Sequence, residues 1–197
     1  MEARRSKRFL VTLLPLLLLG SVAVATEDEA LVAGVFSPPR AAPEFSLRGS
    51  DGKELNLGRF RGKVVILEFG FTSCPDVCPT TLAALAEAHK KLGPEADQLQ
   101  VVYVTVDPER DDVARLREYL AAFDPTFVGG TGTAEELAAV RRSYGVAANK
   151  TTTGDGYTFA HSSYTCLIDR TGSLRALMPY GHSSDDYVHD VRILLKQ

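Results

Sequence analysis

The chain has 197 residues, of which 45% are hydrophobic and 24% are charged, and its formal net charge is −3. These values are ordinary for one globular domain with short extensions. No basic block lies beyond the first residues, so the chain lacks the electrostatic footprint of a nucleic-acid-binding protein.

The N-terminus carries positive charge followed by a long apolar run. Four basic residues within positions 4–8 precede a mostly apolar stretch at 9–25, which ends in Ala23-Val24-Ala25. We predict a signal peptide or membrane anchor over residues 1–25, because this order is typical of a signal and a membrane span needs about 20 apolar residues. Either alternative exports the rest of the chain to a periplasmic or other extracytoplasmic space, attached to the inner membrane if the segment is not cleaved.

Residues 26–41 are predicted to be a linker. Pro38, Pro39 and Pro43 favour an extended tether between the N-terminal segment and the domain. The folded domain is expected over residues 42–197, which is long enough for one well-formed core.

The folded domain should begin with a β-hairpin and continue with alternating strands and helices. In the hairpin, segments 45–47 and 55–57 flank the turn Asp51-Gly52. Further strands are predicted at 64–69, 99–106, 127–128, 157–160, 164–168 and 174–178, and helices at 79–92, 111–123, 133–144 and 184–196. This alternation is typical of the α/β class, with a mixed sheet flanked by helices. With a cysteine pair after the first central strand, the arrangement is similar to the thioredoxin-like fold.

Cys74 and Cys78 follow the predicted strand 64–69, at the carboxyl end where ligand chemistry gathers in α/β sheets. Cys78 should lie at a helix N-terminus, where free N–H groups and the helix dipole favour a thiolate. Side chains four residues apart on a helix have Cβ atoms about 5–6 Å apart, whereas a disulfide prefers about 3.5–4.5 Å. The spacing favours a soft metal, Cu(I) or zinc, and leaves redox exchange open.

Among the four histidines of the chain, His161 is the candidate for a third ligand. It begins the predicted turn between strands 157–160 and 164–168. In a thioredoxin-like fold this turn faces the segment that carries Cys74 and Cys78 after strand 64–69, here called the cysteine loop. A thioredoxin-like reductase usually carries a cis-proline there, but residues 162–169 contain none. An imidazole in that place completes a three-coordinate site with two thiolates. His89 and His189 are better explained as surface residues, and His182, in a loop after Tyr180-Gly181, is a weak candidate.

The run FGFTSCPDVCPTT at 69–81 strongly resembles the signature of the Sco/SenC family. Further similarity lies at 104–111, at 123–125 with 131–133, and at His161-Ser162-Ser163. The resemblance covers about residues 42–197, and the N-terminal segment also fits it. Ala160 departs from the family, which often has an aspartate immediately before the histidine.

The resemblance implies a copper site made of Cys74, Cys78 and His161, for Cu(I), Cu(II) or both. It also implies a role in assembling the dinuclear copper centre of cytochrome c oxidase subunit II, as copper donor, as thiol reductant, or as both. The implied partners are that subunit and a protein that supplies the copper. The alternative function is an exported thiol–disulfide oxidoreductase or thiol peroxidase that uses Cys74 and Cys78.

Two aspartates are candidates for supporting the ligands without binding the metal. Asp76 lies between the cysteines, and Asp107 follows the predicted strand 99–106. Loop capping explains Asp76 equally well, and a strand-terminating turn explains Asp107 equally well. Cys166 lies within a predicted strand and is expected to be a buried structural thiol.

Overall fold

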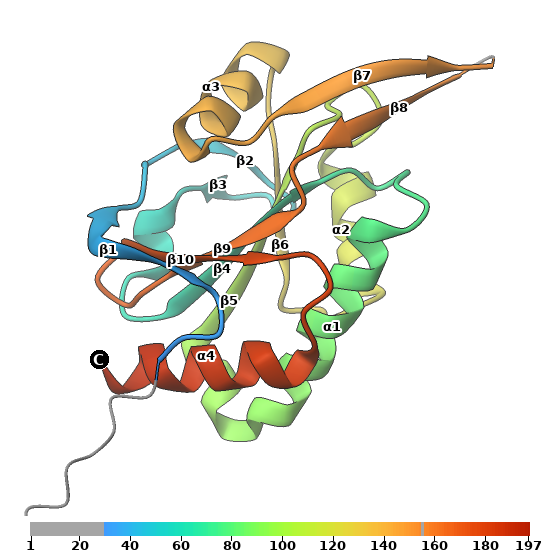
Figure 1. The fold of residues 1–197 in the computed structure, drawn as a ribbon. Coiled ribbons are helices and arrows are strands. Elements are labelled where there is room, and N and C mark those ends of the chain that lie inside the picture. The colour runs from blue at the N-terminus through green and yellow to red at the C-terminus, as the bar shows by residue number, and fades with distance from the viewer. Residues whose placement is uncertain (1–29, 155) are drawn as a thin grey trace, which may run out of the picture.

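A mixed eight-stranded sheet forms the centre of the molecule in the computed structural model, which describes residues 30–154 and 156–197 (Figure 1). The strands of this sheet are β1 (Gly34–Ala41), β2 (Leu47–Gly49), β3 (Glu54–Leu55), β4 (Val64–Gly70), β5 (Leu99–Thr105), β6 (Val128–Thr131), β9 (Tyr164–Ile168) and β10 (Ser173–Pro179). Two further strands, β7 (Ala148–Thr153) and β8 (Gly156–His161), form a separate sheet. The helices are α1 (Val77–Leu92), α2 (Val113–Ala121), α3 (Ala134–Tyr144) and α4 (Ser184–Lys196), with short 3-10 helices at Leu57–Phe60 and Gly93–Gln98.

The strand order in the large sheet is β1-β10-β9-β4-β5-β6-β2-β3. Strands β4, β5 and β6 are parallel to one another, and the other neighbouring pairs are antiparallel. The predicted α/β class, with a mixed sheet flanked by helices and an N-terminal hairpin, is therefore confirmed. The turn around Asp51-Gly52 joins the hairpin strands β2 and β3 as expected.

The central strands β4 and β5 are buried along their whole length, as their nearly continuous apolar sequences predict. Their parallel register pairs Gly70 with Thr105, so both strands end at the same edge of the sheet. The backbone N–H of Val106 donates to the Gly70 carbonyl at 2.7 Å and extends this alignment by one residue. The cysteine loop therefore begins where the paired ends of β4 and β5 hold the backbone in place.

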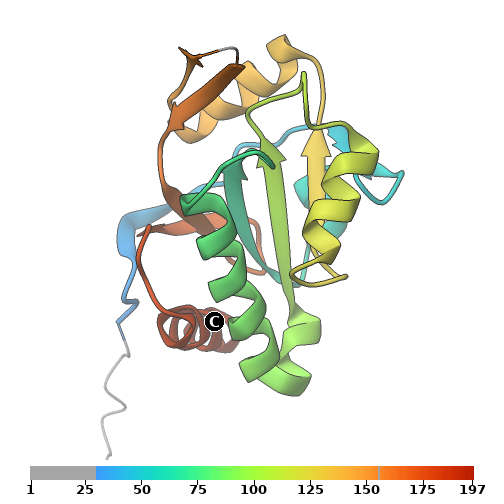
Figure 2. The same ribbon diagram turned by 90° about the vertical axis from the view of Figure 1, so that its right-hand side faces the viewer.

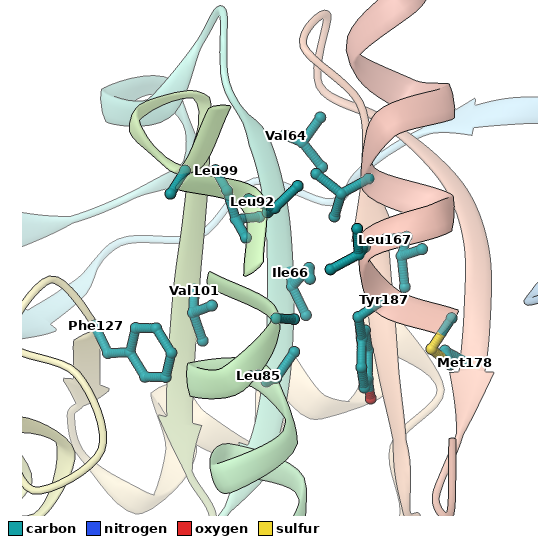
Figure 3. Close-up of a cluster of buried hydrophobic side chains, with 14 of the residues drawn as sticks. Val64, Ile66, Leu85, Leu92, Leu99, Val101, Phe127, Leu167, Met178 and Tyr187 are labelled. Carbon is teal, nitrogen blue, oxygen red and sulfur yellow. The ribbon is translucent and has the colours of Figure 1, made fainter. Parts of the chain in front are cut away.

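Helices cover both faces of the sheet. Side chains of α1, α2 and α4 pack in one apolar cluster, of which Leu85, Leu92 and Tyr187 are examples (Figure 3). Figure 2 shows α1 and α2 on the same side of the central strands. The second cluster lies on the opposite face and includes side chains of α3 and of the N-terminal hairpin. A capping box begins α3, because the Thr133 hydroxyl accepts from the Glu136 N–H and the Glu136 carboxylate accepts from the Thr133 N–H.

The segment predicted as a tether contributes a strand instead. Gly34–Ala41 forms β1, which pairs antiparallel with β10 at the edge of the sheet. The buried Asp190 carboxylate fixes the start of this segment, since it accepts from the backbone N–H of Val32 at 2.8 Å and of Ala33 at 2.9 Å. The prediction of a linker is wrong for residues 34–41. It rested on the prolines, but prolines are compatible with an edge strand, because one side of its backbone has no partner.

Strand β7 was not expected, and it changes the pairing of β8. The two strands form a separate two-stranded sheet, the β7–β8 hairpin, which projects from the domain (Figure 1). We expected strand 157–160 to precede a tight turn into 164–168, but β9 pairs with β4 and β10 instead. The polar sequence of β7, with all residues but Ala148 exposed, carries no apolar alternation that would predict a strand.

The predicted signal or anchor at residues 1–25 lies outside the described residues. In the part of the chain that the structure describes, no helix has both the length and the apolar character required to cross a membrane.

Candidate metal centre

The two cysteines lie between the end of β4 and the first turn of α1. Cys74 is half-buried, and its backbone N–H donates to the Phe71 carbonyl at 3.1 Å. Cys78 is fully buried as the second residue of α1, which begins at Val77. Both cysteines are free thiols. Asp76 occupies the N-cap position of the helix but is exposed and makes no capping hydrogen bond through its side chain, so neither role considered for it is supported by a contact.

His161 faces the buried cysteine. Its Nε2 lies 3.5 Å from the Cys78 Sγ, and its Nδ1 lies 2.8 Å from the Ser162 carbonyl oxygen. Because a carbonyl oxygen only accepts hydrogen bonds, Nδ1 carries the proton of the neutral ring, and the Nε2 lone pair points toward the sulfur. Burial lowers the pKa of His161 and outweighs the opposing effect of the Ser162 carbonyl. The imidazole is therefore held as a neutral donor, the form that binds metals.

The thiol of Cys78 is protonated in the free protein. Burial raises its pKa well above its usual range, against a lowering by the hydrogen bond with the Phe71 backbone. The neighbouring Cys74 and Glu68 raise it further. The helix N-terminus was expected to favour a thiolate here, but desolvation outweighs it. A metal ion bound here would supply the positive charge that this sulfur needs in order to lose its proton.

The Cys78–His161 pair fits a single metal ion. The observed 3.5 Å separation is shorter than the sum of typical metal–sulfur and metal–nitrogen bonds, about 2.3 Å and 2.0 Å in zinc sites, so both atoms could bind one ion. Within residues 30–154 and 156–197, no three histidine, cysteine or carboxylate side chains yet converge closely enough to hold a metal ion. The structure therefore brings Cys78 and His161 together, and Cys74 lies close enough to Cys78 to contribute to its raised pKa.

Aromatic side chains support the imidazole. The Phe71 ring centroid lies 6.0 Å from that of His161 and 5.7 Å from that of Phe159, and both pairs meet edge to face. Phe159 in turn meets Tyr157 at 5.9 Å. These contacts join the cysteine loop to strand β8, which carries His161. Nothing in the local sequence pattern of these aromatic residues relates them to the cysteines.

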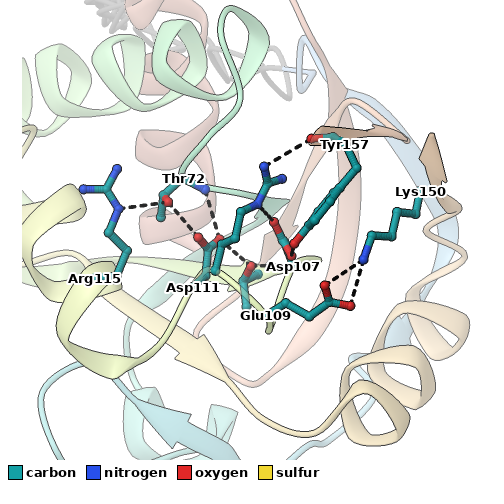
Figure 4. Close-up of polar contacts among 9 residues, drawn as sticks. Thr72, Asp107, Glu109, Asp111, Arg115, Lys150 and Tyr157 are labelled. Carbon is teal, nitrogen blue, oxygen red and sulfur yellow. Dashed lines mark hydrogen bonds and ion pairs between the residues drawn. The ribbon is translucent and has the colours of Figure 1, made fainter. Parts of the chain in front are cut away.

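Asp107 supports this strand without touching a ligand (Figure 4). Its carboxylate accepts from the Tyr157 hydroxyl at 2.9 Å and from the Arg110 guanidinium. Arg110 also donates to the Tyr157 carbonyl oxygen at 3.1 Å and lies over the Tyr157 ring, 3.9 Å from its centroid. Asp107 therefore does not contact a candidate ligand directly. It contacts Tyr157, and through Tyr157 it supports β8, the strand that carries His161.

A second buried carboxylate, Asp111, fixes the cysteine loop (Figure 4). It accepts from the Thr72 backbone N–H at 3.0 Å, from the Thr72 hydroxyl at 2.6 Å and from the Thr105 hydroxyl at 2.6 Å. Arg115 adds a hydrogen bond to the Thr72 hydroxyl at 3.1 Å. The sequence did not reveal this role, because an aspartate in a charged stretch after a strand is usually exposed.

The remaining candidates lie apart from this site. Each of the other histidines has an aspartate at 3.0 to 3.2 Å from its Nδ1, in the pairs His89–Asp124, His182–Asp186 and His189–Asp190. Cys166 is buried in β9, and burial raises its pKa to about 12. This environment agrees with the expected structural thiol.

Comparison with known proteins gives consistent relatives. The SCO1/SenC family model matches residues 36–196. The mitochondrial SCO2 homolog of Mus musculus is 36% identical over 153 residues, which cover 76% of this chain and 60% of that protein. The SCO2-like protein of Rickettsia felis is matched over 64% of its length, so this chain spans only about three-fifths of these relatives.

Solved structures agree with this relationship. Copper-bound ScoI of Bradyrhizobium japonicum is 35% identical, with a TM-score of 0.73 over 79% of this chain and 99% of that one. BsSco, described as a Sco-family cytochrome c oxidase assembly protein with a disulfide switch, is 25% identical, with a TM-score of 0.65 over 80% of this chain and 95% of that one. The chain has the thioredoxin-like fold and belongs to the SCO1/SenC family.

Proposed function

We propose that this protein binds one copper ion through Cys74, Cys78 and His161. The observation that carries the proposal is the 3.5 Å approach of the neutral His161 Nε2 to the Cys78 sulfur, beside a second cysteine. Two thiolates and an imidazole form a soft donor set that suits copper. The copper-bound structure of the related ScoI supports the choice of this metal over zinc.

The protein then acts in the assembly of cytochrome c oxidase, as the description of BsSco supports. Its target is the dinuclear copper centre of subunit II, to which it delivers copper, reduced cysteines or both. A separate protein supplies the copper. The site works on the extracytoplasmic side of a membrane, and the segment at residues 1–25 directs or anchors the chain there.

The alternative, a dedicated thiol–disulfide oxidoreductase or peroxidase, has weaker support. Such an enzyme needs an attacking thiol whose pKa is lowered. Cys78 does not meet this requirement, because burial raises its pKa and the neutral imidazole beside it brings no positive charge to stabilise a thiolate. The same environment suits a thiol that loses its proton to an arriving metal ion.

Copper titration of the reduced protein tests the three ligands. We expect one copper per chain with thiolate-to-copper charge-transfer absorption. Cys74→Ala, Cys78→Ala and His161→Ala should each weaken binding by at least tenfold, because each removes one ligand of three. His182→Ala is the matched control, since it removes an imidazole that pairs with Asp186 instead. A His161→Ala protein with the wild-type spectrum and affinity would refute the proposed site.

Oxidation should abolish copper binding. A metal needs both sulfurs as thiolates, and a Cys74–Cys78 disulfide offers neither. The disulfide switch described for BsSco supports this control of the site by its redox state. We expect one bound copper per reduced chain and none per oxidised chain, measured by equilibrium dialysis. Equal copper content in both forms contradicts redox gating and leaves the ligand assignment to the titration above.

A further inference from the structure

Tyr103 in the central strand β5 is buried in an unusual way. Its side chain is fully buried, and its hydroxyl has no hydrogen-bond partner among the described residues. A buried polar group without a partner destabilises a protein, and phenylalanine would fill the same position without this cost. The hydroxyl therefore needs an explanation outside the packing of the core.

The hydroxyl lies beside the buried cysteine. A Cβ atom placed on Gly70 would lie 2.4 Å from the Tyr103 hydroxyl oxygen and 2.8 Å from the Cys78 sulfur. Both atoms thus approach the same point, and the missing side chain at position 70 leaves them the room to do so.

The acceptor strength of the sulfur depends on its charge. A neutral thiol is a weak acceptor, which agrees with the absence of a hydrogen bond to Tyr103 in the free protein. A thiolate is a strong acceptor, and hydrogen bonds to charged groups are about twice as strong as neutral ones. The hydroxyl is therefore placed to gain its partner when the sulfur loses its proton.

We propose that Tyr103 is a positioning residue that donates a hydrogen bond to the Cys78 sulfur once this sulfur is a metal-bound thiolate. The inference rests on the proposed metal site and deepens it. The hydrogen bond stabilises the metal-bound state. In the metal-free state the same hydroxyl has no partner and destabilises the protein. Removing the hydroxyl should thus have opposite effects on the two states.

The test compares Tyr103→Phe with wild type in both states. In the metal-free protein, Tyr103→Phe should be as stable as wild type or more stable in urea unfolding. In the copper-loaded protein, we expect about tenfold weaker binding and a charge-transfer band shifted to longer wavelength, because the sulfur has lost a hydrogen bond. Tyr187→Phe is the control, since it removes a buried tyrosine hydroxyl whose partner is the Thr165 hydroxyl at 3.3 Å. It should leave affinity and band unchanged.

A parallel titration with Cd(II), which also binds thiolates, separates the two proposals. If wild type binds Cd(II) but no copper, the proposed function fails, and the Cd(II) band and affinity still test the hydrogen bond. Tyr103→Phe with an unchanged band and an affinity within twofold of wild type, for the metal that binds, overturns the role of Tyr103. A Tyr103→Phe protein that is less stable without metal overturns it as well, since the hydroxyl then has a structural partner.

Discussion

Asp111→Ala should lower the free energy of unfolding by about 3 kcal/mol, because it leaves buried hydrogen-bond donors without an acceptor. The carboxylate accepts three hydrogen bonds from Thr72 and Thr105, all of them buried. Two of these hold the residue that precedes Ser73 and Cys74. Urea denaturation of the reduced protein measures the loss of stability.

Asp112→Ala is the matched control for this change. Asp112 is the exposed N-cap of α2, whose side chain accepts from the Arg115 N–H at 2.7 Å. Loss of an N-cap costs about 1 kcal/mol, so the two adjacent substitutions should differ by about 2 kcal/mol. Asp111→Ala should also speed the alkylation of Cys74, because the loop loses its anchor. Equal destabilisation by both substitutions would mean that the Asp111 network contributes no more than an ordinary cap.

Glu68→Gln should stabilise the protein near neutral pH. Glu68 lies fully buried in β4, and burial, with a smaller contribution from Cys74, raises its pKa well above the ordinary value of 4.5. Above pH 4.5 the unfolded chain loses this proton while the folded protein keeps it. The wild-type protein should therefore lose stability as pH rises from 4.5 toward the raised pKa, by up to about 1.4 kcal/mol per pH unit.

Urea unfolding of both proteins at a series of pH values from 4 to 8 measures this effect. Glutamine keeps the shape of the side chain but carries no titrating proton, so the slope should flatten and the two curves should diverge as pH rises. Glu87→Gln, on the exposed side of α1, is the control and should follow the wild-type slope. Parallel curves for wild type and Glu68→Gln would show that Glu68 is ionised in the folded protein.

The sequence predicted the parts of this structure that depend on apolar pattern. Continuous apolar runs revealed β4 and β5, and the helix predicted at 133–144 matches α3 to within one residue. The sequence also indicated that His161 would face the cysteine loop, which the 3.5 Å contact with Cys78 confirms. These features depend on the local order of residues, so a single sequence is enough to predict them.

Other features depend on tertiary surroundings and could not be predicted in this way. Strand β1 contains two prolines and is recognisable only by its partner β10. The burial of Glu68 and Asp111 follows from what packs around them, since both residue types are usually exposed. The protonated state of Cys78 has the same origin, because the helix N-terminus is visible in the sequence and the desolvation is not.

The β7–β8 hairpin makes the side chains of the proposed metal site unequal in how the fold holds them. Cys78 belongs to the first turn of a helix packed on the main sheet, whereas His161 ends a strand that, in the described chain, has no backbone pairing with that sheet. Side chains such as Phe159 and Tyr157 attach the hairpin to the domain. Movement of the hairpin relative to the main sheet would change the distance between His161 and Cys78. The two cysteines and the core would stay in place.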